Sequence, residues 1–344
     1  MKILILGVNG FIGHHLVNQI LAKKKDWIVY GMDLGTDRLG KALDNPRFYF
    51  HEGDIAINRE WIELQIKKCD VVMPLVAIAT PKLYVEDPIA VYHLDFEMNM
   101  DIIKKCVKYH KRVVFPSTSE VYGACEDPEF KEDESFLVVG PINKERWIYS
   151  CCKQLLDRVI YGYGTRGHLE FTLFRPFNWI GPKLDSLNTA KEGSSRVVTQ
   201  FIAELFMKRP INLVDGGKQK RCFTYVDDGI SALMKILENK NDVCKNQIIN
   251  IGNPENECSI KELANILKKL FKEHPDHQND KSYSKIIDTS ADTFYGKGYQ
   301  DIYTRKPSIE KARMLLNWKP EIGLKESLRL TLNSFLKENK NVKI

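Results

Sequence analysis

Tyr149 and Lys153 are four residues apart, in the segment Tyr-Ser-Cys-Cys-Lys. Residues at positions i and i+4 share one face of a helix, so we expect the phenol and the ammonium group to lie side by side. A lysine ammonium stabilises a phenolate and lowers the pKa of the tyrosine. Such a tyrosine can accept a proton from an alcohol while a hydride leaves for a nicotinamide. Because this spacing is common by chance, the interpretation requires a dinucleotide site elsewhere in the chain.

A glycine turn near the start of the sequence predicts that site. The apolar run 3–6 is typical of a strand buried on both faces, and a helical pattern of apolar residues begins near Phe11. Between them stand Gly7, Gly10 and Gly13, at three-residue spacing. A tight turn from strand to helix directs backbone N–H groups and the positive end of the helix at one point, where a pyrophosphate binds.

The aspartate that follows the second predicted strand favours NAD over NADP as the cofactor. Residues 28–32 are followed by Asp33, which lies 20 residues beyond Gly13. A carboxylate at that distance meets the ribose hydroxyls of NAD and repels the 2′-phosphate of NADP. We therefore expect NAD as the cofactor. The residues expected to hold it are Gly7, Gly10, Phe11, Ile12, Gly13, Asp33, Asp54, Ile55, Ala77, Asn99 and Lys153.

Strand and helix patterns alternate along the rest of the chain. Further strands are expected at 48–51, 70–77, 112–116, 171–175 and 247–251. Helices are expected at 60–68, 89–109, 146–163, 196–208, 224–238, 259–272 and 324–338. Ser259 would cap the helix over 259–272, Ser308 would cap a further helix that begins there, and the stretch 273–300 is expected to be polar and irregular. This alternation predicts an α/β fold with a Rossmann-type doubly wound parallel sheet.

The same pass suggests how the chain divides into domains. We expect an NAD-binding domain over 1–176 that is completed by 224–251. The segments 177–223 and 252–320 are expected to form a smaller substrate-binding domain, followed by a C-terminal helix and tail over 321–344.

Composition excludes several classes of protein. The 344 residues carry a net charge of +6, with lysines and arginines scattered rather than clustered, which argues against nucleic-acid binding. The eight cysteines form no C-x-x-C pair, so we expect reduced thiols and no metal site. No apolar run reaches about 18 residues, which argues against a membrane partner. Because the first strand begins at once, no signal peptide is expected, and we predict a cytoplasmic protein.

Several motifs together resemble a known family. The glycine turn, the Tyr149/Lys153 pair and the segment 117–123 (Ser-Thr-Ser-Glu-Val-Tyr-Gly) are similar to extended short-chain dehydrogenases/reductases that act on nucleotide sugars. The segments 174–179, 215–223 and 295–301, which read FRPFNW, DGGKQKRCF and YGKGYQD, resemble the UDP-glucuronic acid decarboxylase branch, the type found in ArnA. The resemblance extends over nearly the whole chain.

This resemblance implies roles for individual side chains. Tyr149, with Lys153 and Thr118, would deprotonate the 4-hydroxyl of the sugar, and Glu120 would act as an acid/base residue near the carbon that carries the carboxylate. Arg305 matches the proton donor of the family, but a guanidinium does not deprotonate readily, so we expect it to hold the carboxylate or orient a water. Glu120 is expected to be protonated or turned away when substrate binds. The predicted substrate contacts are Ala79, Tyr84, Arg146, Asn178, Arg196, Lys220, Arg221 and Tyr299.

Ser119 separates the reactions that such a site could perform. The sugar 4,6-dehydratases that the chain resembles have an aspartate at this place, which serves as the acid for water loss, and simple 4-epimerases lack the glutamate that follows. A serine supplies that proton poorly and leaves room for a carboxylate on carbon 5. Thr118-Ser119-Glu120 therefore favours decarboxylation. One departure from the pattern is Asn212, where the resemblance predicts a basic residue for a phosphate or ribose contact.

The predicted function is NAD-dependent oxidative decarboxylation of UDP-glucuronic acid to a UDP-4-keto-pentose. An enzyme that reduces the ketone again, to UDP-xylose or a UDP-apiose/xylose mixture, stays open because the same residues serve both directions. A related nucleotide-sugar epimerase or dehydratase is a second alternative. A non-catalytic NAD-sensing protein is a third, and the presence of both Tyr149 and Lys153 argues against it.

Two of the predicted helices also suggest an assembly. In the superfamily that the chain resembles, the helices matching 89–109 and 146–163 pair across a two-fold axis, so we expect a homodimer. Both segments carry apolar residues on more than one face, namely Ile102, Ile103, Val107, Leu155, Leu156, Val159 and Ile160.

Overall fold

Seven parallel strands form the central sheet of the computed structural model, which describes residues 1–278 and 284–342. The strand order is β11-β6-β5-β4-β1-β2-β3. The order reverses between β1 and β4, and in such sheets ligands bind at the carboxyl ends beside that reversal. This is the doubly wound α/β fold that the sequence predicts. The strands are β1 (Lys2–Leu6), β2 (Ile28–Asp33), β3 (Phe48–Glu52), β4 (Val71–Pro74), β5 (Arg112–Pro116), β6 (Phe171–Pro176) and β11 (Gln247–Ile251).

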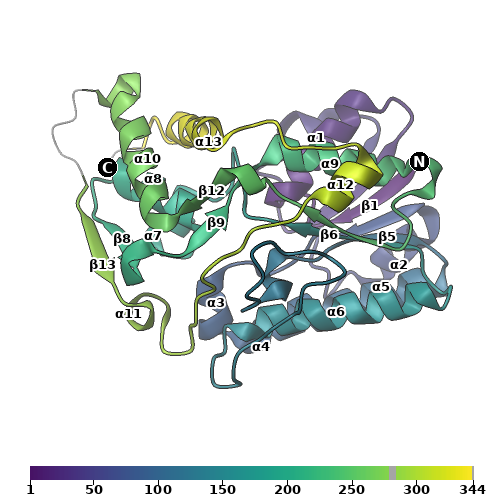
Figure 1. The fold of residues 1–344 in the computed structure, drawn as a ribbon. Coiled ribbons are helices and arrows are strands. Elements are labelled where there is room, and N and C mark those ends of the chain that lie inside the picture. Colours follow the sequence, from purple (N-terminus) through teal and green to yellow (C-terminus); the bar gives the residue numbers. More distant parts are fainter. Residues whose placement is uncertain (279–283, 343–344) are drawn as a thin grey trace.

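Helices cover both faces of the sheet (Figure 1). One face carries α1 (Phe11–Lys23), α9 (Val226–Glu238) and α12 (Glu310–Leu316), and the other carries α2 (Arg59–Lys68), α5 (Asn99–Lys108) and α6 (Trp147–Thr165). Side chains of β1 alternate between the two layers: Ile3 and Ile5 join one hydrophobic core, and Leu4 and Leu6 join the other. The strand is thus buried on both sides, as its unbroken apolar run predicts.

The remaining elements gather to the left of the sheet in Figure 1. Ser259 caps α10 through a capping box with Glu262, as the sequence predicts. The short strands pair β7 with β10, β8 with β13 and β9 with β12. These elements are α7 (Leu187–Lys191), α8 (Val197–Phe206), α10 (Ile260–Glu273), α11 (Ala291–Tyr295), α13 (Leu324–Glu338), β7 (Trp179–Ile180), β8 (Ile211–Val214), β9 (Lys220–Cys222), β10 (Thr224–Tyr225), β12 (Glu257–Ser259) and β13 (Ile286–Thr289).

The helix predicted over 89–109 is made of three consecutive segments. It begins with α4 (Pro88–Tyr92), continues as the π-helical segment η2 (His93–Met98) and ends with α5. A π-helical turn widens the helix by one residue and changes which side chains point inward. Here it places Asp95, a charged residue, at a position with no exposed surface.

Three sequence predictions of local structure were wrong. β4 ends at Pro74 rather than at Ala77, because proline has no N–H to continue the ladder. The helix predicted to open at Ser308 begins at Glu310 instead; Ser308 is buried and its N–H donates to the Phe130 carbonyl. The stretch 273–300, expected to be irregular, contains β13 and α11, while 279–283 lies outside the described residues.

Most of the apolar residues named for a dimer face belong to the core of the chain itself. Ile102, Ile103, Leu156 and Ile160 are buried beneath the sheet, whereas Leu155 is 48% exposed. Their burial follows from contact of α5 and α6 with β4, β5 and β6. In the part of the chain that the structure describes, no helix combines the length and apolar character needed to cross a membrane.

Candidate active site

The glycine turn between β1 and α1 has the geometry that a pyrophosphate requires. Gly7 has a φ of +84°, and a Cβ on Gly13 would lie 2.5 Å from the Gly7 carbonyl oxygen, so larger residues would force the turn apart. The helix begins at N-cap Gly10 without a side-chain cap or an acidic residue in its first turn. Its N–H groups therefore point at open space, and the turn fits a dinucleotide phosphate.

Asp33 is tied to the same turn. Its carboxylate accepts the N–H of Asn9 at 2.8 Å and that of Leu34 at 2.8 Å. Each carboxylate oxygen has a second lone pair, so the group can still accept ribose hydroxyls. This arrangement fits NAD, whose ribose carries hydroxyls and no 2′-phosphate.

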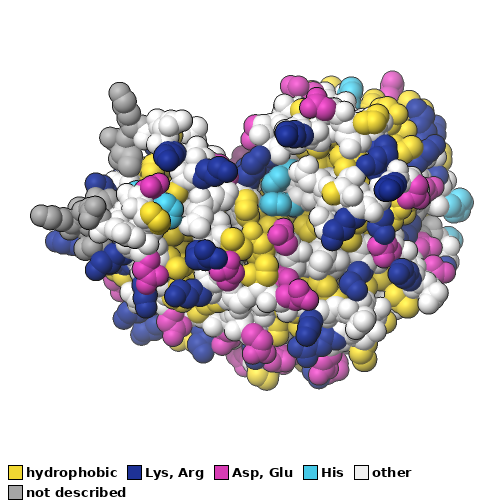
Figure 2. All heavy atoms as spheres, turned by 90° about the horizontal axis from the view of Figure 1, so that it is seen from above, with side chains coloured by type: hydrophobic (Ala, Val, Ile, Leu, Met, Phe, Trp, Pro, Cys, Tyr) yellow, Lys and Arg dark blue, Asp and Glu magenta, His cyan; other side chains and the backbone are white. Residues whose placement is uncertain are grey.

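A cavity of about 490 Å³ extends from this turn to the C-terminal elements. Seen from above, the molecule is hollowed between two lobes, with lysine and arginine side chains on both sides of the hollow (Figure 2). Predicted site residues that line the cavity are Gly7, Gly10, Phe11, Ile12, Gly13, Ala77, Ala79, Tyr84, Thr118, Ser119, Glu120, Tyr149, Lys153, Asn178, Arg196, Arg221, Tyr299 and Arg305. Those outside its lining are Asp33, Asp54, Ile55, Asn99, Arg146 and Lys220.

Tyr149 lies in this cavity with its ring stacked on another aromatic side chain. The ring of Tyr84, from α3 (Pro81–Glu86), is parallel to it within 7° at a centroid distance of 4.7 Å. Thr118 favours the ionised form of the phenol. Burial raises the pKa of Tyr149 well above its usual value, and the carboxylates of Asp95 and Glu120 raise it further. The expected lowering of the Tyr149 pKa is therefore wrong for the protein without ligands.

After burial itself, the second cause of this raised pKa is Asp95, the partner of Lys153. The Lys153 ammonium is almost fully buried and is 3.5 Å from a carboxylate oxygen of Asp95. It also donates to the Pro116 carbonyl at 3.3 Å. The positive charge expected to act on Tyr149 is thus offset by a buried negative charge from η2. Asp95 was missed in the sequence, although a carboxylate within an apolar helical pattern is a detectable signal.

Asn99 does not reach the cavity. Its amide donates to the carbonyl oxygens of Leu94 at 3.0 Å and Val76 at 3.3 Å. It therefore joins the π-helical segment to the end of β4.

Glu120 lies between two arginines. Its carboxylate accepts from Arg146 at 2.7 Å through one oxygen and is 2.7 Å from the Arg305 guanidinium through the other. Burial alone would raise the pKa of Glu120, but Arg146 and Arg305 lower it to about 2. Without a ligand, Glu120 is therefore ionised; its protonation or rotation when substrate binds stays a prediction. Arg305 also donates to the Ser119 hydroxyl at 3.2 Å.

Arg146 and Lys220 occupy places different from those expected of substrate contacts. Arg146 is 1% exposed and lies behind Glu120, so it acts on the cavity through that carboxylate. Lys220 is half exposed and is 3.5 Å from Glu257. Neither side chain lines the cavity: Glu120 covers Arg146, and β9 directs Lys220 outward.

Arg221 brings a third guanidinium to the cavity. It donates to the Asp301 carboxylate at 2.7 Å and to the Ile302 carbonyl at 2.7 Å. Tyr299 donates to the same carboxylate at 3.3 Å. With Arg146, Arg305 and Glu120, this cluster has three guanidinium groups and two carboxylates, an excess of one positive charge.

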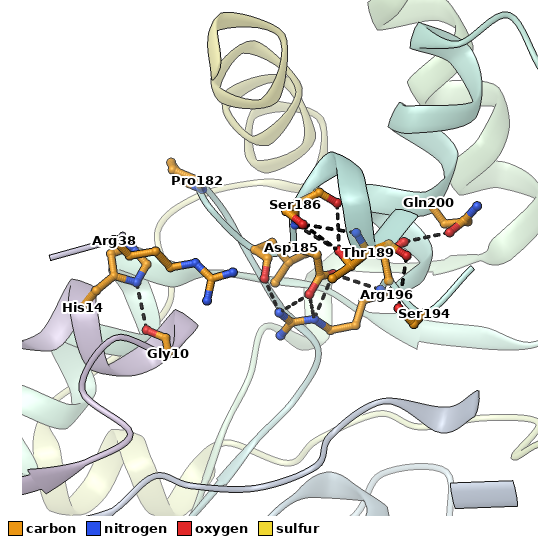
Figure 3. Close-up of polar contacts among 12 residues, drawn as sticks. Gly10, His14, Arg38, Pro182, Asp185, Ser186, Thr189, Ser194, Arg196 and Gln200 are labelled. Atoms are coloured by element: carbon orange, nitrogen blue, oxygen red, sulfur yellow. Dashed lines mark hydrogen bonds and ion pairs between the residues drawn. The ribbon is translucent and has the colours of Figure 1, made fainter. Parts of the chain in front are cut away.

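Arg196 and Asp185 form a separate pair near the glycine turn (Figure 3). Arg196 donates to the carboxylate at 2.7 and 3.1 Å, and its guanidinium lies 5.2 Å from the Phe11 ring. The pair joins the segment before α7 to the N-cap of α8, and the ring contact joins Arg196 to the start of α1. At the other end of the cavity, the Asn178 amide donates to the Cys222 carbonyl at 3.1 Å, and Asn212 donates to Glu204 at 3.3 Å.

Comparison with known proteins supports the same conclusion as the geometry. The model of the NAD dependent epimerase/dehydratase family matches residues 3–252. The crystal structure of PbgP3 protein from Burkholderia pseudomallei is 55% identical, with a TM-score of 0.88, and the match covers 97% of this chain and 96% of that one.

More distant structures share the fold. A UDP-glucose 4-epimerase from Thermotoga maritima, solved with UDP-glucose, is 22% identical over 98% of this chain and 99% of its own, with a TM-score of 0.80. A UDP-glucuronic acid 4-epimerase from Bacillus cereus, solved with UDP-glucuronic acid and NAD, is 23% identical over 98% and 100%, with a TM-score of 0.80. The chain therefore belongs to the NAD-dependent epimerase/dehydratase family, and its cofactor is NAD.

Proposed function

We propose that the protein converts UDP-glucuronic acid to a UDP-4-keto-pentose by oxidation followed by decarboxylation. The observation that carries this proposal is the excess positive charge of the arginine cluster beside Tyr149. A buried charge without a counterion is unfavourable, so the cavity is suited to a ligand that brings a carboxylate. UDP-glucuronic acid has such a group on carbon 5.

The oxidation begins at Tyr149. Its phenol, assisted by Thr118, takes the proton of the 4-hydroxyl through a phenolate form, and Lys153 lies on the same helical face. NAD, when bound, supplies the hydride acceptor. The glycine turn and Asp33 are the groups of this chain that would hold it.

The second step follows from the position of the new ketone. A carbonyl on carbon 4 is β to the carboxylate, so it accepts the electron pair that the departing carbon dioxide leaves on carbon 5. We assign Arg305 and Ser119 to the carboxylate end of the substrate. Glu120, being ionised, holds Arg305 and Arg146 in place and is not the proton donor in this state. A proton from water, added to carbon 5, completes the reaction.

Incubation with UDP-glucuronic acid and NAD, followed by mass spectrometry, tests the proposal. We expect a product that has lost carbon dioxide, with one NADH formed for each molecule. A pentose product without net NADH indicates an enzyme that reduces the ketone again. A product that retains the carboxylate would overturn decarboxylation and favour an epimerase. UDP-glucose serves as the matched ligand without a carboxylate.

We further propose that the protein is a homodimer through α4, η2 and α6. Ile89 and Tyr92 are exposed on α4, and Leu155 and Tyr161 are exposed on α6. Light scattering at micromolar concentration should give twice the chain mass. A monomer, or a dimer that survives Leu155→Glu together with Tyr161→Glu unchanged, would contradict this face.

A further inference from the structure

Asp95 is a buried carboxylate for which the reaction above has no role. It lies in the π-helical segment η2 and has no exposed surface. Burial raises its pKa, and the nearby Lys153 lowers it. An ionised group at such a position is costly unless it is paired, so its partners indicate its purpose.

Both carboxylate oxygens of Asp95 are directed at the catalytic site. One accepts the Ile78 N–H at 2.9 Å, and the other is 3.5 Å from the Lys153 ammonium. Ile78 stands between Ala77 and Ala79, which line the cavity. Asp95 thus joins the lysine to the edge of the cavity.

Tyr149 is surrounded by charges from several elements. Lys153 lies on its own helix, with the ammonium 5.8 Å from the Tyr149 ring centroid. Asp95 approaches from η2, Glu120 from the segment after β5, and Arg305 from the segment before α12, while Tyr84 of α3 and Thr118 are uncharged. Arg305 is already paired with Glu120, so Asp95 is the group that balances Lys153.

We propose that Asp95 is a positioning residue of the active site: its carboxylate holds the Lys153 ammonium and offsets its charge beside Tyr149. This inference rests on the assignment of Tyr149 as the base. On this inference, Lys153 alone does not activate the Tyr149 phenol. A ligand that brings positive charge, or one that draws Lys153 away from Asp95, is needed before the proton leaves.

The test is an ultraviolet titration of Tyr149. The phenolate absorbs differently from the phenol, and subtracting the same protein with Tyr149→Phe isolates one tyrosine. Asp95→Asn should lower the apparent pKa of Tyr149 by about 1 unit or more, because an unbalanced ammonium favours the phenolate. Lys153→Met should raise it, and the double variant should return it toward the wild-type value.

Asp101→Asn is the matched control, because Asp101 pairs with Lys105 on the exposed side of α5. It should leave the titration unchanged. If Asp95→Asn titrates like the wild type, the proposal is wrong. Should Asp95→Asn fail to fold, the double variant decides, since it buries no unpaired charge: a titration equal to that of Lys153→Met would overturn the proposal. The measurement uses no substrate, so an error in the proposed substrate does not affect it.

Discussion

Two clusters of buried charge flank Tyr149, and they are balanced differently. On one side, Lys153 and Asp95 bring one positive and one negative charge. On the other, Glu120 lies between Arg146 and Arg305, and the cluster with Arg221 and Asp301 has one positive charge in excess. The charges of the first cluster cancel within the chain, whereas the second cluster keeps an uncompensated positive charge. Under the proposed function, the carboxylate of the substrate is attracted to the Glu120 side of Tyr149.

The largest effect should come from Tyr149→Phe, which removes the group on which both clusters act. We expect NADH formation to fall at least about 100-fold, because general base catalysis is lost. Binding of UDP, measured by calorimetry, should stay nearly unchanged. Tyr303→Phe, at an exposed tyrosine, is the control, and near-normal activity of Tyr149→Phe would refute the proposed base.

Glu120→Gln breaks the cluster with excess charge by leaving two buried guanidinium groups without a counterion. We expect a loss of about 3–5 kcal/mol in the free energy of unfolding at neutral pH, measured by urea denaturation. Glu129→Gln, which removes the half-exposed partner of Lys306, should cost no more than about 1 kcal/mol.

The pH dependence of that loss has a defined sign. The pKa of Glu120 is about 2 in the folded protein against an ordinary value of 4.5, so the folded state favours the carboxylate. Its stabilisation is present above pH 4.5 and is lost as the pH falls toward 2. The difference between wild type and Glu120→Gln should therefore narrow below pH 4.5, and a constant difference would contradict the ion-pair explanation.

Arg305→Ala sharpens the comparison by removing the excess charge while leaving the Lys153 side intact. A charge-assisted contact to a carboxylate contributes about 1.5–3 kcal/mol, so the affinity for UDP-glucuronic acid should fall roughly 10- to 150-fold. The affinity for UDP should change little, and UDP-glucose should be a poor substrate of the wild type. Lys306→Ala is the neighbouring control; equal losses for both ligands would remove Arg305 from the carboxylate site.

The effect that is smallest at neutral pH concerns the cofactor side of the molecule. Burial and the neighbouring His15 lower the pKa of His14 to about 3, against 6.5 in the unfolded chain. The unfolded state then binds the proton first, so stability falls as the pH drops from 6.5 toward 3, by up to about 1.4 kcal/mol per unit. His14→Asn should flatten this slope in acid denaturation, and the exposed His93→Asn should not.

The strands and helices could be predicted from the sequence where the local pattern of apolar residues and glycines agreed with the contacts that the segment makes in the folded protein. The apolar run of β1 and the three-residue spacing of the glycines are visible within a few positions of the chain, and the strand and the turn both occur as expected. The pattern failed at Ser308, whose N–H is taken by Phe130, and in 273–300, where β13 is stabilised by pairing with β8. In those places a distant partner determined the structure.

The amino-acid sequence by itself determined the alternation of strands and helices, the glycine turn with Asp33, and the shared helical face of Tyr149 and Lys153, because these depend on residues close together in the chain. Only the tertiary structure decided which charged side chains are paired in the active site and how they change the pKa of Tyr149. Ser119 and Arg305 are separated by 186 positions and yet are in hydrogen-bond contact. The pKa of Tyr149 is raised because burial, Asp95 and Glu120 outweigh the groups that favour the phenolate. Charge balance depends on distance and burial, which folding alone creates.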